Sequence, residues 1–326
     1  MDASVELAEP EAPDTAAVRR FAFHGAGGEL LGIVITNALL TLMTLGFYRF
    51  WGRCHVRRYL WGNTEFEGDR FMYHGTGREL LRGFVKAMFV FGLPFLLANV
   101  LPLLGGVAFA AAGQLLGYVI AFVFAAIGMV GARRYRMSRS SWRGIRFSFR
   151  GGVRQYVRIL LRGGVLTAVT LGFYAPVFRT ARHRFMVSHS YFGNRQFGFD
   201  GTGKALVRPY VVALLLTLPT LGISWMWYAA RCHRYFWEHT SFDTARFRPS
   251  FAPHELVALW LTNLLLVLCT LGLGFGWATA RTARFVCSRL VLEGPLDLGA
   301  IEQDAQAVSA VGEAISDFLD LGFDLG

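Results

Sequence analysis

The stretch ELLGIVITNALLTLMTLGFYRFWGRCHVRRYLWGNTEFEGDRFMYHGTGREL, residues 29–80, spans one unit of a pattern that occurs five times along the chain. The copies begin near residues 21, 71, 147, 197 and 247, so the spacings between their starts are 50, 76, 50 and 50 residues. Four copies place Thr-Leu-Gly 23 residues after the start, and all five place an arginine followed by an aromatic residue at a second fixed position. A period near 50 residues indicates a tandem-repeat architecture.

One unit has the pattern of two helices followed by a β-hairpin. The first apolar run begins after Glu29, and the helix dipole favours an acidic residue in the first turn. Thr44-Leu45-Gly46 interrupts this run, and residues 47–61 resume it with arginines at helical spacing. Residues 63–75 then alternate apolar and polar side chains around Gly68-Asp69, which predicts a β-hairpin.

Composition points to a bilayer. Apolar residues make up 54% of 326 positions, and the mean hydropathy is +0.39. Residues 87–132 carry no charged side chain, and a run of this length exceeds the roughly 20 residues needed for one crossing. Gly105-Gly106 interrupts the run, so we expect two spanning helices there. The acidic start of the chain does not resemble a cleavable signal sequence.

Charge divides the chain into three segments. Residues 1–18 hold five acidic side chains and are expected to be a disordered N-terminus, while 293–326 form an acidic tail with eight. The membrane domain of five repeats, 19–292, carries all 33 basic residues and nine acidic ones. These basic residues lie at the ends of apolar runs, which indicates the cytoplasmic side of a bacterial inner membrane rather than nucleic-acid binding. We expect a multi-pass protein with both termini in the cytoplasm.

The direction of each unit through the membrane has two interpretations. Single crossings would place the same arginines and hairpins on alternating sides, whereas helical hairpins with Thr-Leu-Gly at the tip would keep them on one side. The 26 extra residues of the second unit favour the hairpin, since they would lengthen both arms by about 13 residues, or roughly 20 Å each. Arms of about 16 residues are short for a 30 Å core, so the short units are either re-entrant or single-crossing.

We therefore expect a mainly α-helical integral membrane protein of five tandem helical hairpins joined by short β-hairpins. The first strand, 20–24, and the last, 289–293, each lack a partner. Their pairing would close the five units into a pseudo-fivefold ring, which removes exposed strand edges.

The residues quoted at the start resemble the YjgN-like family of bacterial inner-membrane proteins, which is built on a domain of unknown function. The Thr-Leu-Gly-aromatic, Arg-Arg-Tyr-Leu, Asn-Thr and Tyr-His-Gly-Thr-Gly strings carry this resemblance, which covers about residues 19–300. It implies a multi-pass inner-membrane protein and supplies no activity, substrate or catalytic residue.

The arginine column is the main candidate site, as an anion or lipid-headgroup site or as an anchor that pairs with acids at the helix starts. Its members share one position in the five units: Arg58, Arg134, Arg184, Arg234 and Arg284. We predict that they lie at one membrane level, close to acidic residues or lipid phosphates.

Other polar residues also follow the repeat. Arg78 and Lys204 start helices after Gly-Thr-Gly turns, where free N–H groups could hold a lipid phosphate. The string from Gly198 to Lys204 resembles a phosphate loop but is followed by alanine where Ser or Thr would bind magnesium. Asn37 and Asn263 share one position inside apolar arms, where they either tie helices together or line a polar path. The paired histidines favour packing at interfaces.

The expected function is membrane transport, a channel or lipid handling, because repeated units around an axis commonly build a membrane path. A scaffold or regulatory subunit of a membrane complex is the alternative. It is suggested by residues 299–321, an amphipathic acidic helix that would dock on its own chain or bind a protein partner. We expect no enzyme, catalytic residue, metal site or cofactor, because no nucleophile–base pair or ligand set recurs. Anionic membrane lipids are the expected partners.

Overall fold

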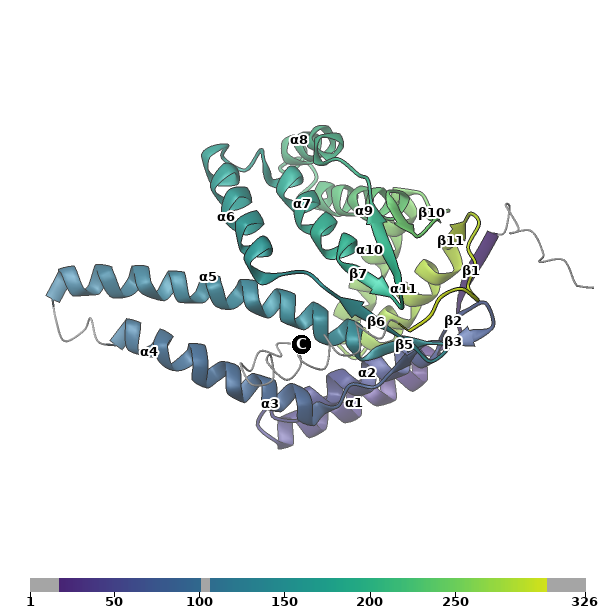
Figure 1. Cartoon of the computed structure of the whole chain (residues 1–326), viewed down its shortest axis with the longest axis horizontal. Coiled ribbons are helices and arrows are strands. Elements are labelled where there is room, and N and C mark those ends of the chain that lie inside the picture. Colours follow the sequence, from purple (N-terminus) through teal and green to yellow (C-terminus); the bar gives the residue numbers. More distant parts are fainter. Residues whose placement is uncertain (1–17, 101–105, 304–326) are drawn as a thin grey trace, which may run out of the picture.

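The computed structural model describes residues 18–100 and 106–303, which form five pairs of helices attached to one sheet (Figure 1). In the first four units, two helices run out and back and the strands of a hairpin follow them; in the fifth unit of the described chain, the single strand Leu290–Glu293 follows. The first arms are α1 (Gly27–Met43), α3 (Gly77–Ala87) continued by a π-helical turn (Met88–Gly92) and α4 (Leu93–Val100), α6 (Val153–Val169), a 3₁₀ turn (Gly203–Leu206) continued by α8 (Val207–Leu215), and α10 (Pro253–Cys269). The second arms are α2 (Arg49–Gly62), α5 (Gly106–Ser138), α7 (Ala175–Ser188), α9 (Ile223–Glu238) and α11 (Phe275–Arg289).

The strands of all units belong to a single antiparallel sheet in the described part of the chain. They are β1 (Val18–Phe23), β2 (Thr64–Phe66), β3 (Asp69–Arg70), β4 (Met72–Tyr73), β5 (Ser140–Trp142), β6 (Ile145–Phe149), β7 (Ser190–Phe192), β8 (Arg195–Phe199), β9 (Thr240–Phe242), β10 (Ala245–Pro249) and β11 (Leu290–Glu293). Their order is β3-β2-β1-β11-β10-β9-β8-β7-β6-β5-β4. The two end strands, β3 and β4, are separated by Phe71 alone, so the sheet is nearly closed.

The first and last strands pair with each other, as the sequence predicted. Val18 lies opposite Glu293, and Arg20 lies opposite Val291. This contact joins residues that are about 275 positions apart, and it places the start and the end of the described chain side by side.

The expected fold class, a mainly α-helical membrane protein whose β-hairpins only join the helical units, is wrong. The hairpins do not merely join helical units, because each one also pairs with its neighbours, as β6 does with β7, and together they form an 11-stranded barrel-like sheet. Unpaired strand edges leave backbone donors and acceptors without partners, and pairing between hairpins removes this cost. A mainly helical membrane ring is therefore not what the chain forms.

Two helical segments of the described chain are long and apolar enough to cross a membrane, Gly77–Val100 and Ala111–Ser138. They are the arms of the second unit, so the prediction that its extra residues lengthen both arms is confirmed. This pair projects well beyond the other helices (Figure 1). The apolar helices α1 and α10 have 17 residues each and are shorter than a typical span.

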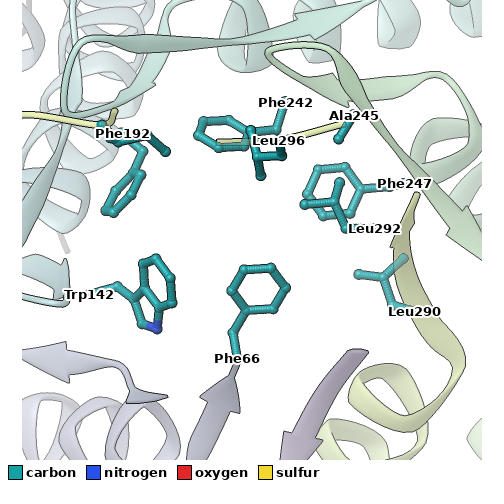
Figure 2. Packing of buried hydrophobic residues seen from close by; sticks show 10 residues of the cluster. Phe66, Trp142, Phe192, Phe242, Ala245, Phe247, Leu290, Leu292 and Leu296 are labelled. Atoms are coloured by element: carbon teal, nitrogen blue, oxygen red, sulfur yellow. The ribbon is translucent and has the colours of Figure 1, made fainter. Parts of the chain in front are cut away.

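The interior of the sheet is filled with aromatic and aliphatic side chains that point toward one another (Figure 2). Each hairpin contributes one large residue from the same position of its first strand: Phe66, Trp142, Phe192, Phe242 and Leu292. The phenylalanines that open the five copies pack against this cluster. Adjacent rings are close, with centroids 5.3 Å apart for Phe66 and Trp142, and such pairs each contribute about 0.5–1.5 kcal/mol beyond burial.

After β11 the chain crosses the same cluster. Leu296 and Ile301 are buried in it, Arg19 Nη2 donates to the carbonyl of Leu296 at 2.9 Å, and the N–H of Asn194 donates to the carbonyl of Glu302 at 3.1 Å. The first residues of the expected tail helix, 299–303, are therefore extended chain and turn rather than helix. The rest of that helix lies outside the described residues.

Thr-Leu-Gly forms the turn at the tip of each of the four short hairpins. Thr44 Oγ1 donates to the Leu40 carbonyl at 2.7 Å and accepts the N–H of Tyr48 at 2.9 Å, so it ends one helix and begins the next. Leu45 and Gly46 have φ values of 51° and 96°, a left-handed region that glycine tolerates and leucine adopts at a cost. The same conformation recurs at residues 171–172, 221–222 and 271–272.

Candidate functional site

The arginine column binds backbone carbonyls of neighbouring units. The guanidinium groups of Arg58, Arg134, Arg184 and Arg284 donate to the carbonyl oxygens of Gly75, Gly151, Gly201 and Gly25 at 3.5, 3.2, 2.8 and 2.9 Å. Each bond links a second arm to the turn that starts the next unit, and that of Arg284 links the last unit to the first. Arg234 instead binds Glu238 on its own helix at 2.7 Å.

The four receiving glycines share one local geometry. At each of these glycines, an aromatic ring two residues earlier folds back so closely that a Cβ would overlap it; at Gly151 the Phe149 ring would be 2.5 Å away. In the fifth unit this position is the buried Phe251 instead of a glycine. Within residues 18–100 and 106–303, Arg234 is the one member of the column that forms an ion pair with an acid, and the predicted proximity to lipid phosphates stays a prediction.

Acidic residues at the helix starts pair with other arginines. Glu79 binds Arg139 at 2.8 Å and Glu255 binds Arg289 at 3.2 Å. Glu29 accepts a hydrogen bond from the hydroxyl of Tyr59 at 2.9 Å. The predicted pairing of these acids with the arginine column is therefore wrong, because Glu79 and Glu255 pair with arginines five residues after the column members, and Glu29 pairs with Tyr59.

Arg78 and Lys204 are exposed at the start of α3 and of the 3₁₀ turn before α8. The hydroxyl of Thr76 accepts the N–H of Glu79 as an N-cap, and the N–H of Thr202 donates to the hydroxyl of Tyr235 at 2.7 Å. These contacts are the ones that strand-to-helix turns need. The two basic side chains lie next to helix N-termini, where the helix dipole favours an anion.

The two asparagines predicted to lie within the membrane join the arms of their own hairpins. Asn37 Nδ2 donates to the carbonyl of Gly52 at 3.2 Å, and Asn263 Nδ2 donates to the carbonyl of Ala278 at 3.2 Å and to Thr282 Oγ1 at 3.0 Å. Of the two predicted roles, the contacts are those of helix ties.

A second basic column lies immediately before the arginine column, and the sequence analysis recognised only its two histidines, as packing residues. It consists of Arg57, Arg133, His183 and His233 on four successive second arms. Arg57 Nη1 donates to the hydroxyl of Tyr73 at 3.3 Å, and Arg133 Nη2 donates to Ser190 Oγ at 3.1 Å. The shared repeat position was visible in the sequence, but the interior location of these residues was not.

The members of this second column act on each other electrostatically. Arg57 acts on Arg136 of α5, Arg136 on Arg133, and Arg133 on His183 of α7. Burial, followed by the charges of Arg133, Arg179 and His233, lowers the pKa of His183 to about 4. Burial and Arg179 also lower the pKa of His233. Positive charge therefore accumulates between neighbouring hairpins.

Among the described residues there is no group of three or more His, Cys, Asp or Glu that could hold a metal ion. The four cysteines are free thiols. The chemistry available at the second basic column is that of arginine and histidine, which suits an anion.

These features define a class of protein in which apolar helical hairpins radiate from one nearly closed antiparallel sheet, with basic residues at the hairpin bases. The chain belongs to the family described as "Bacterial protein of unknown function (DUF898)", whose model matches residues 18–223 and 209–318.

Curated relatives share part of the chain. It is 32% identical over 156 residues to the Inner membrane protein YjgN of Escherichia coli strain K12, a match that covers 47% of this chain and 36% of that protein. It is 38% identical over 69 residues to the Inner membrane protein YjgN of Salmonella typhimurium, covering 21% and 17% of the two chains. The matches therefore span about a third or less of the relatives' own length. No solved structure matches the chain at a significant level.

Proposed function

We propose that this protein resides in the bacterial inner membrane and handles anionic lipids, with its hairpin arms among acyl chains and basic residues at the hairpin bases near phosphate headgroups. The observation that carries the proposal is the exposure of the leucines at the four short tips. Leu45, Leu171, Leu221 and Leu271 are 91%, 89%, 93% and 95% exposed. Leucines held at exposed tips in a left-handed conformation are costly in water and favourable in lipid.

Other side chains support the same placement. Large apolar residues are exposed along the arms near these tips, including Leu42 and Met43 of α1, and along the long α4–α5 pair. The arginines lie at the opposite ends of the second arms, next to the sheet. An apolar layer followed by a basic layer fits an acyl-chain region followed by anionic headgroups.

The packed sheet favours lipid handling over conduction. Phe66, Trp142 and Phe242 fill its interior, and residues 294–303 cross the same cluster. An ion path along the sheet axis would need polar groups or water there.

The test is the lipid composition that the protein retains. The chain is purified in mild detergent from a membrane of known phosphatidylglycerol and phosphatidylethanolamine content, and the retained lipids are quantified. We expect phosphatidylglycerol to be enriched, and we expect the enrichment to fall when salt is raised because exposed charges are screened within about 8 Å at physiological ionic strength.

A pair of variants sharpens the test. The double replacement Arg78→Gln and Lys204→Gln, at exposed helix starts, should lower the enrichment by about half, by the loss of two surface cations. Arg146→Gln, at an exposed position of β6, removes one positive charge from the sheet and should leave the enrichment unchanged. Retained lipids that match the bulk membrane in the unmodified protein would overturn the proposal.

A further inference from the structure

Three members of the second basic column each bury a nitrogen that lacks a hydrogen-bond partner. These atoms are Nε of Arg133, Nε2 of His183 and Nδ1 of His233, and none of them has a partner among the described residues. Buried polar atoms in folded proteins are almost always hydrogen-bonded, so each of these atoms calls for a further partner. The three residues lie on successive second arms, α5, α7 and α9.

The same region holds positive charge without a counter-charge. Arg133 and Arg179 both act electrostatically on His183, and Arg179 also acts on His233. Arg133 donates to a serine hydroxyl, and the Arg179 guanidinium lies 5.7 Å from the ring centre of Phe236. Within the described chain, no carboxylate forms an ion pair with Arg133, Arg179, His183 or His233. Partly buried cations are costly without an anion nearby.

Aromatic packing fixes the position of the His183 ring. It stacks on Phe236 with centroids 4.1 Å apart and planes 9° apart, and it meets the edge of Phe199 at 5.0 Å. The imidazole is therefore held in place by rings from its own hairpin strand and from the next second arm. A fixed ring nitrogen beside a guanidinium is suited to hydrogen-bonding one oxyanion from two sides.

We propose that Arg133, Arg179, His183 and His233 bind a phosphate-type anion between α5, α7 and α9. The Nε of Arg133 and the ring nitrogens donate hydrogen bonds to its oxygens, and Arg179 supplies a second full positive charge. The anion is either free phosphate or the phosphate of a lipid headgroup, and the inference rests on the lipid-handling proposal only for the second source. A metal ion is disfavoured here because the cluster offers two histidines and otherwise only cations.

The experiment uses the full chain, delipidated in detergent, in a phosphate-free buffer. Binding of inorganic phosphate is measured by titration calorimetry, and retention of phosphatidylglycerol is measured by native mass spectrometry. Arg133→Gln removes the guanidinium. Arg158→Gln is the matched control, because Arg158 is exposed on the neighbouring helix α6 and its loss makes the same change in net charge.

We expect the unmodified protein to bind one anion, Arg133→Gln to bind it at least tenfold more weakly, and Arg158→Gln to bind it within twofold of the unmodified protein. Binding of inorganic phosphate assigns the site to a free anion, whereas retention of one lipid without phosphate binding assigns it to a headgroup. If Arg133→Gln does not fold, as judged by elution volume and circular dichroism, His183→Gln is compared in its place. Equal binding by the folded cluster variant, or no binding of either ligand by the unmodified protein, would overturn the inference. The lipid enrichment proposed above is measured separately, and its absence would not contradict the binding of an anion at this site.

Discussion

At the scale of single residues, glycines at the strand-to-helix turns decide how the units join. Gly151 lies beneath the ring of Phe149 and close to Phe185, and its carbonyl accepts the bond from Arg134. Its neighbour Gly152 has open space where a Cβ would be. Two adjacent glycines thus differ only in what surrounds them.

We expect Gly151→Ala to destabilise the protein by about 1–3 kcal/mol, because the added methyl group overpacks against two aromatic rings. Gly152→Ala should change the stability by less than about 0.5 kcal/mol. Thermal unfolding of the two variants in the same detergent measures the difference. Similar midpoints for the two variants would contradict this account of the turn.

The titration of His183 gives a second prediction at this scale. Its pKa is about 4 in the folded protein because of burial and of Arg133, Arg179 and His233, and about 6.5 in an unfolded chain. The unfolded chain therefore takes up a proton that the folded chain refuses between these values, so stability falls as the pH decreases from 6.5 to 4.

His183→Phe retains an aromatic ring against Phe236 and cannot titrate. In phosphate-free buffer we expect it to flatten this part of the pH profile by on the order of 1–2 kcal/mol. His254→Gln serves as the control, because His254 is exposed at the start of α10. The measurement is denaturant unfolding at several pH values, and a His183→Phe profile parallel to that of the unmodified protein would show that the ring is not buried neutral.

At the scale of elements, each short hairpin has two ends of opposite character. The tip of α10 and α11 carries Leu271 and the exposed Cys269, while the other end of α11 carries the exposed Ser288 next to the sheet. Cys54 and Cys232 are buried, so replacing Cys287 by serine leaves Cys269 as the accessible thiol among the four.

We expect a polarity-sensitive fluorophore on Cys269 to shift to shorter wavelength and to be quenched by spin-labelled acyl chains after reconstitution into vesicles, because the proposed function places the apolar tip in lipid. The same fluorophore on Ser288→Cys, with Cys269 replaced by serine, should remain in a polar environment. Equal emission and quenching at the two positions would mean that the hairpin does not point its tip into the bilayer.

At the scale of the whole molecule, the pairing of β1 with β11 holds the two ends of the sheet together. Val18 is opposite Glu293 in this register, and neither side chain is buried. A disulfide between these positions would close a loop of most of the chain, for which the chain-entropy estimate is about 5–6 kcal/mol of stabilisation.

We expect the Val18→Cys, Glu293→Cys pair to cross-link efficiently under mild oxidation in a background without the native cysteines. The off-register pair of Val18→Cys with Val291→Cys should cross-link much less, because their Cα atoms are not partners in the ladder. Migration on a non-reducing gel measures both reactions. Equal cross-linking of both pairs would show that the sheet does not hold this register.

The positions of the helices, tips and hairpins within the five units were predictable, because each of these elements depends on residues close to it in the same unit. Thr44, Leu45 and Gly46 form a tip because their own backbone bonds require it, and the fixed spacing repeats this in other units. The pairing of the first and last strands was predictable too, since each lacked a partner in the sequence.

The sequence by itself determined the units, their lengths and the separation of apolar arms from basic bases. Only the tertiary structure decided that neighbouring hairpins pair into one sheet, that Arg184 reaches a glycine carbonyl of the next unit, and that His183 is partly buried within electrostatic reach of Arg133. The physical reason is range: helix and turn formation depends on residues a few positions apart, whereas these contacts join separate units and depend on how all five pack together.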